Sequence, residues 1–116
     1  MNDLKSIQAS VKVIKKYDCP LAILHCTSMY PTPYKHVRIG AIPLLRKKFP
    51  FAVIGSSDHS IGIETSLGAV ALGASIIEKH FTVNTKWSGP DNIISINPSE
   101  LKKLNRYSKN VWEALG

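Results

Sequence analysis

Several residue types and patterns are scarce in this sequence, and each scarcity excludes a class of protein. Its two cysteines, Cys19 and Cys26, lack a CxxC spacing, which favours free, buried thiols over a disulfide. The longest apolar run, AVALGASII, is far shorter than the roughly 20 residues that cross a bilayer. The first residues, MNDLKSIQ, lack the apolar core of a signal peptide. The sequence therefore predicts a cytoplasmic protein without a membrane partner.

Acidic residues are also scarce, since 8 Asp and Glu stand against 15 Lys and Arg. A basic excess can serve nucleic-acid binding, but here it is spread over three segments in which basic and apolar positions alternate, as on amphipathic helices. No aromatic platform or known nucleic-acid motif accompanies it, so we predict no nucleic-acid partner. With 44% hydrophobic residues, the chain has the composition of one compact domain.

The hydrophobic periodicity switches repeatedly along the chain. Apolar spacings of three and four predict helices, and nearly continuous apolar runs predict strands that are covered on both faces. The predicted helices cover 2–16, 37–48 and 61–72 and run from 98 towards the C-terminus, and the predicted strands cover 21–26, 51–55 and 74–81.

Capping residues and breakers refine these boundaries. Asn2 is a candidate N-cap of the first helix, and Asn97 followed by Pro98 and Glu100 is the signature of a capped helix start. Pro43 is awkward inside the second helix, because it removes a hydrogen bond, so this helix is expected to begin late or to bend. The lone His25 is expected to be a packed, hydrogen-bonded side chain of the first strand.

The order α-β-α-β-α-β-α with buried-type strands calls for a parallel sheet with helical crossovers. Three strands are few for an open doubly wound sheet, and a (β/α)₈ barrel needs about 250 residues. We therefore predict an α/β fold in which residues 1–116 form the last three β/α units of a TIM barrel plus the preceding helix. The alternative is a compact three-stranded α/β mini-domain.

A pair of histidines carries the clearest functional signal. His59 ends the run FAVIGSSDH and His80 ends ASIIEKH, 21 residues later, which is about one helix plus one strand. Because neighbouring parallel strands lie roughly 4.8 Å apart, the two side chains are predicted to lie at the same level and to hold one metal ion. Glu78 faces the same way as His80, while Lys79 points to the helix layer, where its stem can snorkel.

The run Ser57-Asp58-His59 invites interpretation as a hydrolase triad. Triad members meet from separate segments, however, and three consecutive residues point in different directions. Ser57 is better suited to donate its hydroxyl to a phosphate or carboxylate at the strand end, or to stabilise a turn. For Glu78, the structural alternative is a buried ion pair with a basic residue of a neighbouring strand.

Four segments, LHCTSMYPTPY, IGSSDHSIGIE, VALGASIIEKHFT and GPDNIIS, occur in this order and together resemble the sialic-acid synthase family. Its members make N-acetylneuraminate and related nonulosonic acids from phosphoenolpyruvate and an N-acylated amino sugar. The resemblance runs over nearly the whole chain but covers only the last part of the family's catalytic barrel. It implies a C–C bond-forming transferase whose divalent metal, Mn²⁺ or Mg²⁺, polarises the aldehyde of open-chain N-acetylmannosamine. The methylene carbon of phosphoenolpyruvate attacks this aldehyde, water adds to the resulting cation, and phosphate leaves by C–O cleavage.

The resemblance also implies roles for individual residues. His59 and His80 would be the protein's metal ligands, with water and substrate completing the shell. Ser28 and Ser57 match positions that contact phosphoenolpyruvate. Tyr30 would line the sugar pocket, and Asp91 matches an acidic residue that hydrogen-bonds the acceptor sugar. Glu78 would be an inward catalytic carboxylate near the metal. Without the resemblance, Asp91 is typical of a turn. Its GPD triplet favours sialic or legionaminic acid over the pseudaminic branch.

The chain departs from the family in places. Lys35-His36 stands where an acidic pair is common, and Pro43 interrupts a usually regular helix. The early strands with the phosphate-binding basic residues, and the antifreeze-like domain that follows the barrel, have no counterpart in 1–116. We therefore expect the chain alone to be inactive and to need a complementing N-terminal half or a second copy. The alternatives are a non-catalytic remnant or interaction module that complements another chain, or another phosphoenolpyruvate or aldolase-type barrel.

Overall fold

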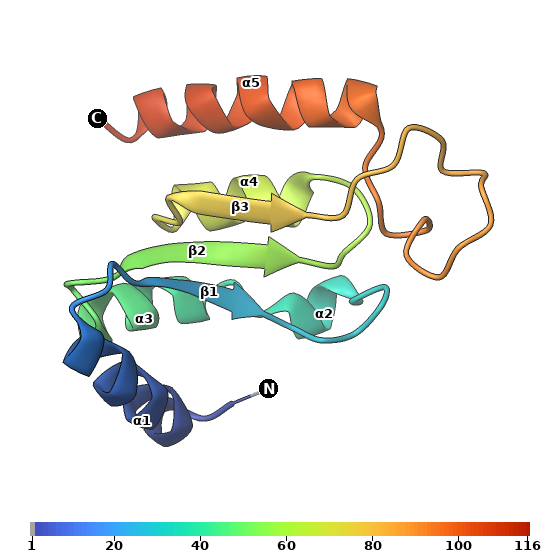
Figure 1. The fold of residues 1–116 in the computed structure, drawn as a ribbon. Helices are drawn as coiled ribbons and strands as arrows, with labels where there is room; N and C mark the ends of the chain where they lie inside the picture. The colour runs from blue at the N-terminus through green and yellow to red at the C-terminus, as the bar shows by residue number, and fades with distance from the viewer. Residues whose placement is uncertain (1) are drawn as a thin grey trace.

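A computed structural model describes residues 2–116, in which helices and strands alternate along the chain (Figure 1). The elements are α1 (Leu4–Ile14), the 3₁₀ turn η1 (Lys15–Tyr17), β1 (Ala22–Cys26), α2 (Tyr34–Val37), α3 (Ala41–Lys48), β2 (Val53–Asp58), α4 (Glu64–Ala71), β3 (Ile76–Lys79) and α5 (Pro98–Ala114). Within these residues, the three strands form one parallel sheet in the order β1-β2-β3. The predicted α/β fold with a parallel sheet and helical crossovers is confirmed.

The helices cover one face of this sheet. Side chains of α1, α3 and α4 pack with the strand residues Ile54, Ile23 and Ile77 in one apolar cluster, and Ile42 of α3 is fully buried there. The opposite face carries Leu24 and Gly55, which are paired across β1 and β2 and lie outside this cluster. Among the described residues, every helix of the cluster lies on the first face. The sheet is therefore one-sided, unlike most parallel sheets, which are covered on both faces.

The second strand lies later in the chain than the sequence predicted. The prediction was 51–55, whereas β2 runs from Val53 to Asp58. The polar residues at its end belong to the strand because they pair on both sides: Ser57 lies in register with Cys26 of β1, and Asp58 with Lys79 of β3. Phe51 is instead exposed, beneath the Lys15 ammonium and against Phe49.

Helix starts follow their local chemistry. The late start expected for the second helix is confirmed, because α3 begins at Ala41 and places Pro43 in its first turn, where N–H groups have no intrahelical acceptor. The N-cap of α1 is Asp3, which accepts from Ser6 N, so the prediction of Asn2 was wrong by one residue. The capping box predicted at Asn97 is present.

The cysteines and the apolar character of the helices can also be compared with the sequence. Both cysteines are free, as predicted, but Cys19 is exposed and Cys26 half-buried, so the prediction that the thiols are buried was wrong. None of the helices in residues 2–116 combines the length and apolar character that crossing a membrane requires.

Candidate functional site: a histidine pair at the strand ends

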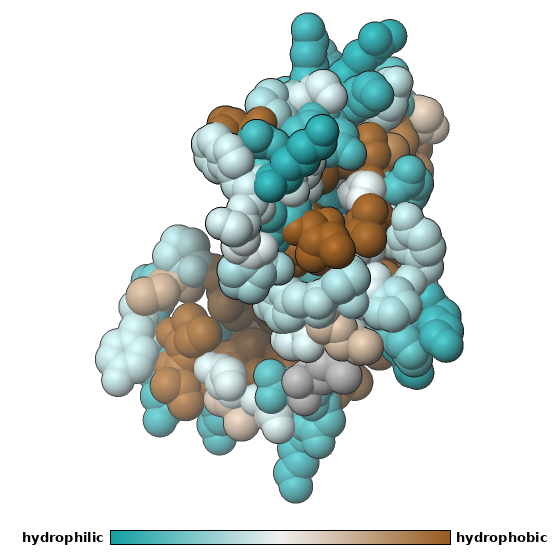
Figure 2. Space-filling model, turned by 90° about the vertical axis from the view of Figure 1, so that its right-hand side faces the viewer, coloured by the Kyte–Doolittle hydropathy of each residue, from teal (hydrophilic) through white to brown (hydrophobic). Residues whose placement is uncertain are grey.

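The carboxyl ends of the three strands meet at one edge of the sheet, at the right in Figure 1, together with α2 and the loop 80–97. Figure 2 looks at the molecule from this side and shows apolar residues in the middle of the view, with hydrophilic residues above them. Parallel α/β folds gather their functional groups at this edge. The candidate site residues from the sequence all lie in the strand ends and loops of this region.

His59 and His80 come together as the spacing predicted. His59 directly follows Asp58, and His80 directly follows Lys79. Because Asp58 and Lys79 are paired across β2 and β3, the two imidazoles lie at the same level of the sheet. Their ring centroids are 5.2 Å apart with the planes at 77°. Two imidazoles at this separation can bind a single ion between them.

The hydrogen bonding of His59 fixes which nitrogen is free. Its Nδ1 lies 2.9 Å from the backbone oxygen of Thr27, and a carbonyl only accepts, so Nδ1 carries the proton. Nε2 then has its lone pair available, 3.4 Å from Ser57 Oγ. A backbone carbonyl behind one imidazole nitrogen is the usual support of a histidine that binds metal through the other.

The partner histidine has a carboxylate beside it. His80 Nδ1 lies 3.6 Å from Asp91 Oδ2, a separation that is too long for a direct hydrogen bond. The Asp91 side chain is 54% exposed, and its backbone oxygen accepts from Ser95 Oγ at 2.8 Å. Asp91 therefore sits at the rim of the histidine pair with its carboxylate open to solvent.

Tyr30 packs against both imidazoles. Its ring stacks on His59 with centroids 4.2 Å apart and meets His80 edge-on at 5.9 Å. The tyrosine is otherwise exposed. The structure thus brings together three of the residues that the sequence singled out, from the ends of three different strands.

Ser57 and Glu78 form a second polar pair on the same face of the sheet. They occupy paired positions of β2 and β3, and the Ser57 hydroxyl donates to Glu78 Oε2. Glu78 is exposed, so the structural alternative of a buried ion pair for this residue is wrong.

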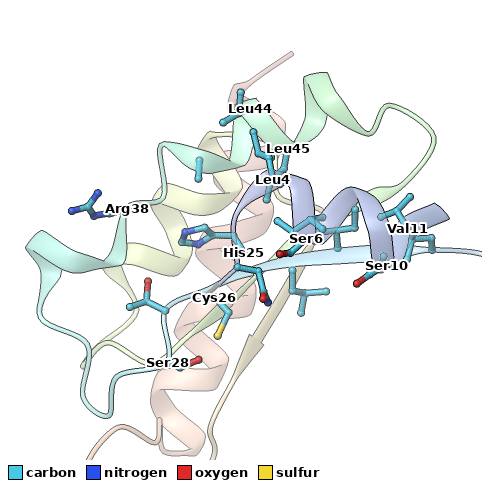
Figure 3. A pocket seen from close by; sticks show the side chains of 18 of the residues that line it. Leu4, Ser6, Ser10, Val11, His25, Cys26, Ser28, Arg38, Leu44 and Leu45 are labelled. Atoms are coloured by element: carbon cyan, nitrogen blue, oxygen red, sulfur yellow. The ribbon is translucent and has the colours of Figure 1, made fainter. Parts of the chain in front are cut away.

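Ser28 directly follows Thr27, whose carbonyl is bound by His59, and lines a groove of about 620 Å³ between α1, β1 and α3. Figure 3 shows this groove with Leu4 and Val11 of α1, Leu44 and Leu45 of α3, and His25 beside Cys26 on β1. Among residues 2–116, no hydrogen bond joins the Ser28 side chain to His59 or His80.

His25 differs from its predicted state. Its Nδ1 is buried and finds no hydrogen-bond partner among residues 2–116, so the expectation of a hydrogen-bonded side chain is wrong for this nitrogen. Burial lowers the pKa of His25 below the ordinary histidine value, because a charged imidazole loses its hydration there.

Sequence reasoning missed the polar network on the helix side of the same strand ends. Asp58 Oδ1 accepts from Ser60 N at 2.8 Å and Ser60 Oγ at 2.7 Å, and Oδ2 accepts from Thr65 Oγ1 and Ser66 Oγ, both at 2.6 Å. Burial raises the pKa of Asp58, but the hydrogen bonds from Ser66, Thr65 and Ser60 outweigh it and hold the pKa below the usual value.

Lys79 completes this network. Its ammonium lies 3.3 Å from Asp58 Oδ2, and both side chains are nearly fully buried, with 2% of Lys79 and 1% of Asp58 exposed. Lys79 does point to the helix layer, but its head is buried in an ion pair and does not snorkel. Opposite charges at adjacent strand positions, each one residue before a histidine, were the available signal for this pair.

The network also explains why Ser57-Asp58-His59 forms no hydrolase triad. Asp58 points away from His59, and the position behind His59 Nδ1 is taken by the Thr27 carbonyl. Within residues 2–116, no group of three or more His, Cys, Asp and Glu side chains is placed to hold a metal ion. A metal at the histidine pair would therefore have two protein ligands and open positions for water or substrate.

With this geometry in place, comparison with known proteins decides the family. The model of the NeuB family matches residues 1–116. The chain belongs to the NeuB family. Proteins similar to the chain include an N,N'-diacetyllegionaminic acid synthase from Campylobacter jejuni, 41% identical over 119 residues. The human N-acetylneuraminate-9-phosphate synthase is 36% identical over 116 residues. The predicted resemblance to sialic-acid synthases is confirmed.

A solved structure gives the same assignment. The N-acetylneuraminic acid (sialic acid) synthetase from Leptospira borgpetersenii, crystallised with citrate, superposes with a TM-score of 0.97 at 41% identity. All of this chain is covered in each of these comparisons, but only 35% of the Campylobacter protein, 32% of the human protein and 40% of the Leptospira chain. The chain thus spans about a third of the length of the curated NeuB relatives that it matches.

Proposed function

We propose that this chain supplies the metal site and part of the substrate pocket of a synthase that condenses phosphoenolpyruvate with an N-acetylated amino sugar, such as N-acetylmannosamine, and releases phosphate. The observation that carries the proposal is the pair His59 and His80, side by side at the carboxyl edge of the sheet with ring centroids 5.2 Å apart. Membership in a family that includes sialic and legionaminic acid synthases supplies the reaction class.

His59 and His80 would hold a divalent metal through one imidazole nitrogen each, and the Thr27 carbonyl keeps His59 Nε2 free for this role. When bound, the ion supplies Lewis-acid polarisation of the sugar aldehyde. The two nitrogen donors favour Mn²⁺ over Mg²⁺, because Mg²⁺ takes oxygen ligands and holds its water tightly.

The surrounding side chains bind and orient the two substrates. Tyr30 provides an aromatic wall over the histidines for the sugar, and the exposed carboxylate of Asp91 accepts hydrogen bonds from its hydroxyl groups. Ser57 and Ser28 donate to phosphoenolpyruvate. The single Ser57 hydroxyl proton is donated to Glu78 in the structure, and it turns to phosphoenolpyruvate when this substrate binds, which leaves the Glu78 carboxylate free beside the metal.

The sheet itself is part of the last three β/α units of a TIM barrel. Its one-sided covering supports this proposal, because the face with Ser57, His59 and His80 would be the inside of the closed barrel. The rest of the barrel comes from a complementing N-terminal half, and the chain without it is inactive.

The test is calorimetric titration of MnCl₂ into the 116-residue chain, alone and mixed with the N-terminal barrel half of a close relative. We expect His59→Ala and His80→Ala each to abolish binding of the ion, while His36→Ala, at a histidine outside the site, leaves it unchanged. Phosphate release from phosphoenolpyruvate and N-acetylmannosamine is expected only in the mixture.

Each alternative predicts a different result. A folded chain that binds no Mn²⁺ in either state would refute the metal site and favour a non-catalytic remnant. Mn²⁺ binding together with condensation of an aldehyde that lacks the N-acetyl group, at the same rate, would favour another phosphoenolpyruvate or aldolase-type barrel.

A further inference from the structure

The ion pair of Asp58 and Lys79 lies directly behind the histidine pair. Asp58 precedes His59 and Lys79 precedes His80. Asp58 and Lys79 occupy paired positions of β2 and β3. Since successive side chains of a strand point to opposite faces, the ion pair faces the helices while both imidazoles face away from them. The two pairs therefore share the same short stretch of backbone.

The ammonium of Lys79 holds the backbone on both sides of His59. It donates to the backbone oxygen of Ser60 at 2.6 Å and to that of Asp58 at 3.3 Å, besides its contact with the Asp58 carboxylate at 3.3 Å. These three acceptors match the three donors of an ammonium group. One side chain of β3 thus holds the backbone carbonyls of the residues before and after His59, which directly follows β2.

The Asp58 carboxylate fixes the path of residues 58–60 through its own hydrogen bonds. It accepts from the backbone N–H and the hydroxyl of Ser60, and Thr65 and Ser66 of α4 donate to its other oxygen. The Ser60 hydroxyl also lies 2.6 Å from Thr65 Oγ1. The path of the chain through residues 58–60 is thereby tied to the start of α4 as well as to β3.

A two-histidine site depends on such support. Among residues 2–116 no third His, Cys, Asp or Glu is placed to join the two histidines around an ion, so the separation of the imidazoles is set by the backbone that carries them. Small errors in the position of ligands are costly for binding and catalysis.

We propose that Asp58 and Lys79 are positioning residues, which lock His59 and His80 in register for a divalent metal. The inference rests on the proposed function only for the identity of the ligand, since the locking of His59 is a property of the metal-free chain. Neither residue touches the ion or a substrate. Their effect passes through the backbone of residues 58–60 and the Nδ1 hydrogen bond of His59.

The test uses the double variant Asp58→Asn/Lys79→Met in the full 116-residue chain. Removing one charge alone would leave the other buried without a partner, and such a variant is expected to be strongly destabilised. Replacing both charges keeps the volume and leaves no buried charge unpaired. The matched control is Glu113→Gln/Lys109→Met, which removes an exposed ion pair of α5.

Two measurements are made at equal folded fraction, as judged by far-UV circular dichroism. The first is the affinity for Mn²⁺, which we expect to fall 10- to 100-fold in the double variant, as it does when support behind metal ligands is lost, and to stay unchanged in the control. The second is the imidazole ¹⁵N spectrum of the metal-free chain. It is expected to show one tautomer of His59, with the proton on Nδ1, in the wild type and a mixture in the double variant.

The outcomes separate the two proposals. A folded double variant with the tautomer of His59 unchanged would overturn the positioning role, and so would unchanged Mn²⁺ affinity if the wild type binds the ion. If the wild type binds no Mn²⁺ while the tautomer changes in the double variant, the proposed metal function fails and the positioning role stands.

Discussion

The two faces of the sheet at the ends of β2 and β3 differ sharply, although their residues alternate in the chain. On the helix side, Asp58 and Lys79 are buried and every oxygen and donor is engaged. On the other side, His80 and Glu78 are partly or largely open, and their contacts leave donors and acceptors free. Buried, fully hydrogen-bonded groups and solvent-accessible groups thus alternate between neighbouring residues of the same strands. The buried face is expected to govern stability, and the open face ligand binding.

The largest stability effect is expected from breaking the buried pair at one end. Asp58→Ala leaves the Lys79 ammonium buried without its counter-charge, so the free energy of unfolding is expected to fall by about 3–5 kcal/mol. Urea denaturation measures this loss. Glu113→Ala, in the exposed pair with Lys109, is the control and should cost less than about 1 kcal/mol. Equal losses in the two variants would show that the buried ion pair contributes no more to stability than the exposed one.

One serine on each face of the sheet allows the stability cost of a Ser→Ala substitution to be compared between the two faces. Ser66 donates to the buried Asp58 carboxylate, and Ser57 donates to the exposed Glu78. We expect Ser66→Ala to cost about 1.5–3 kcal/mol of unfolding free energy, as for hydrogen bonds to charged groups. Ser57→Ala should cost clearly less, because water replaces the lost donor. A larger loss for Ser57→Ala would reverse the assignment of the two faces.

Acid should weaken the buried face through Asp58. Because the folded-state pKa of this carboxyl lies below the unfolded value of about 3.9, its stabilisation is complete above that value and is lost as the pH falls through the folded-state pKa. Urea denaturation at a series of pH values between about 5 and 2 should show a smaller fall of unfolding free energy for Asp58→Asn than for the wild type. Parallel curves would contradict this.

The smallest effect concerns His25, which lies on the helix side like Asp58 but has an unsatisfied nitrogen. Since burial lowers its folded-state pKa, unfolding takes up a proton, and stability declines as the pH drops from about 6.5 through the folded-state pKa. His25→Phe should flatten the stability curve in this range. A curve that stays as steep as that of the wild type would exclude a buried, neutral His25.

Much of this arrangement was predictable from the sequence, and the failures have local causes. The positions of His59 and His80 followed from strand spacing, because parallel strands that are joined by one helix usually lie side by side, and α5 followed from its capping box, which depends on residues close in the chain. The end of β2 was missed because its polar residues look like a loop until the partners of Asp58 are known. These partners come from α4 and β3, and hydrogen bonds between side chains of different elements are not visible in apolar periodicity.

The same limit applies to single side chains. Lys79 was expected to reach solvent, since lysine is seldom buried without a partner, and its partner could be identified only from the register of β2 and β3. His25 was expected to be hydrogen-bonded by general preference, and the missing partner at Nδ1 is a tertiary fact.

The shared metal site is tested most directly by pulsed electron paramagnetic resonance of the chain loaded with one equivalent of Mn²⁺. We expect hyperfine couplings from the nitrogens of two imidazoles in the wild type, and the loss of both couplings in His59→Ala and likewise in His80→Ala, because neither variant binds the ion. A spectrum without nitrogen couplings, or one that neither substitution changes, would contradict a metal site shared by these two histidines.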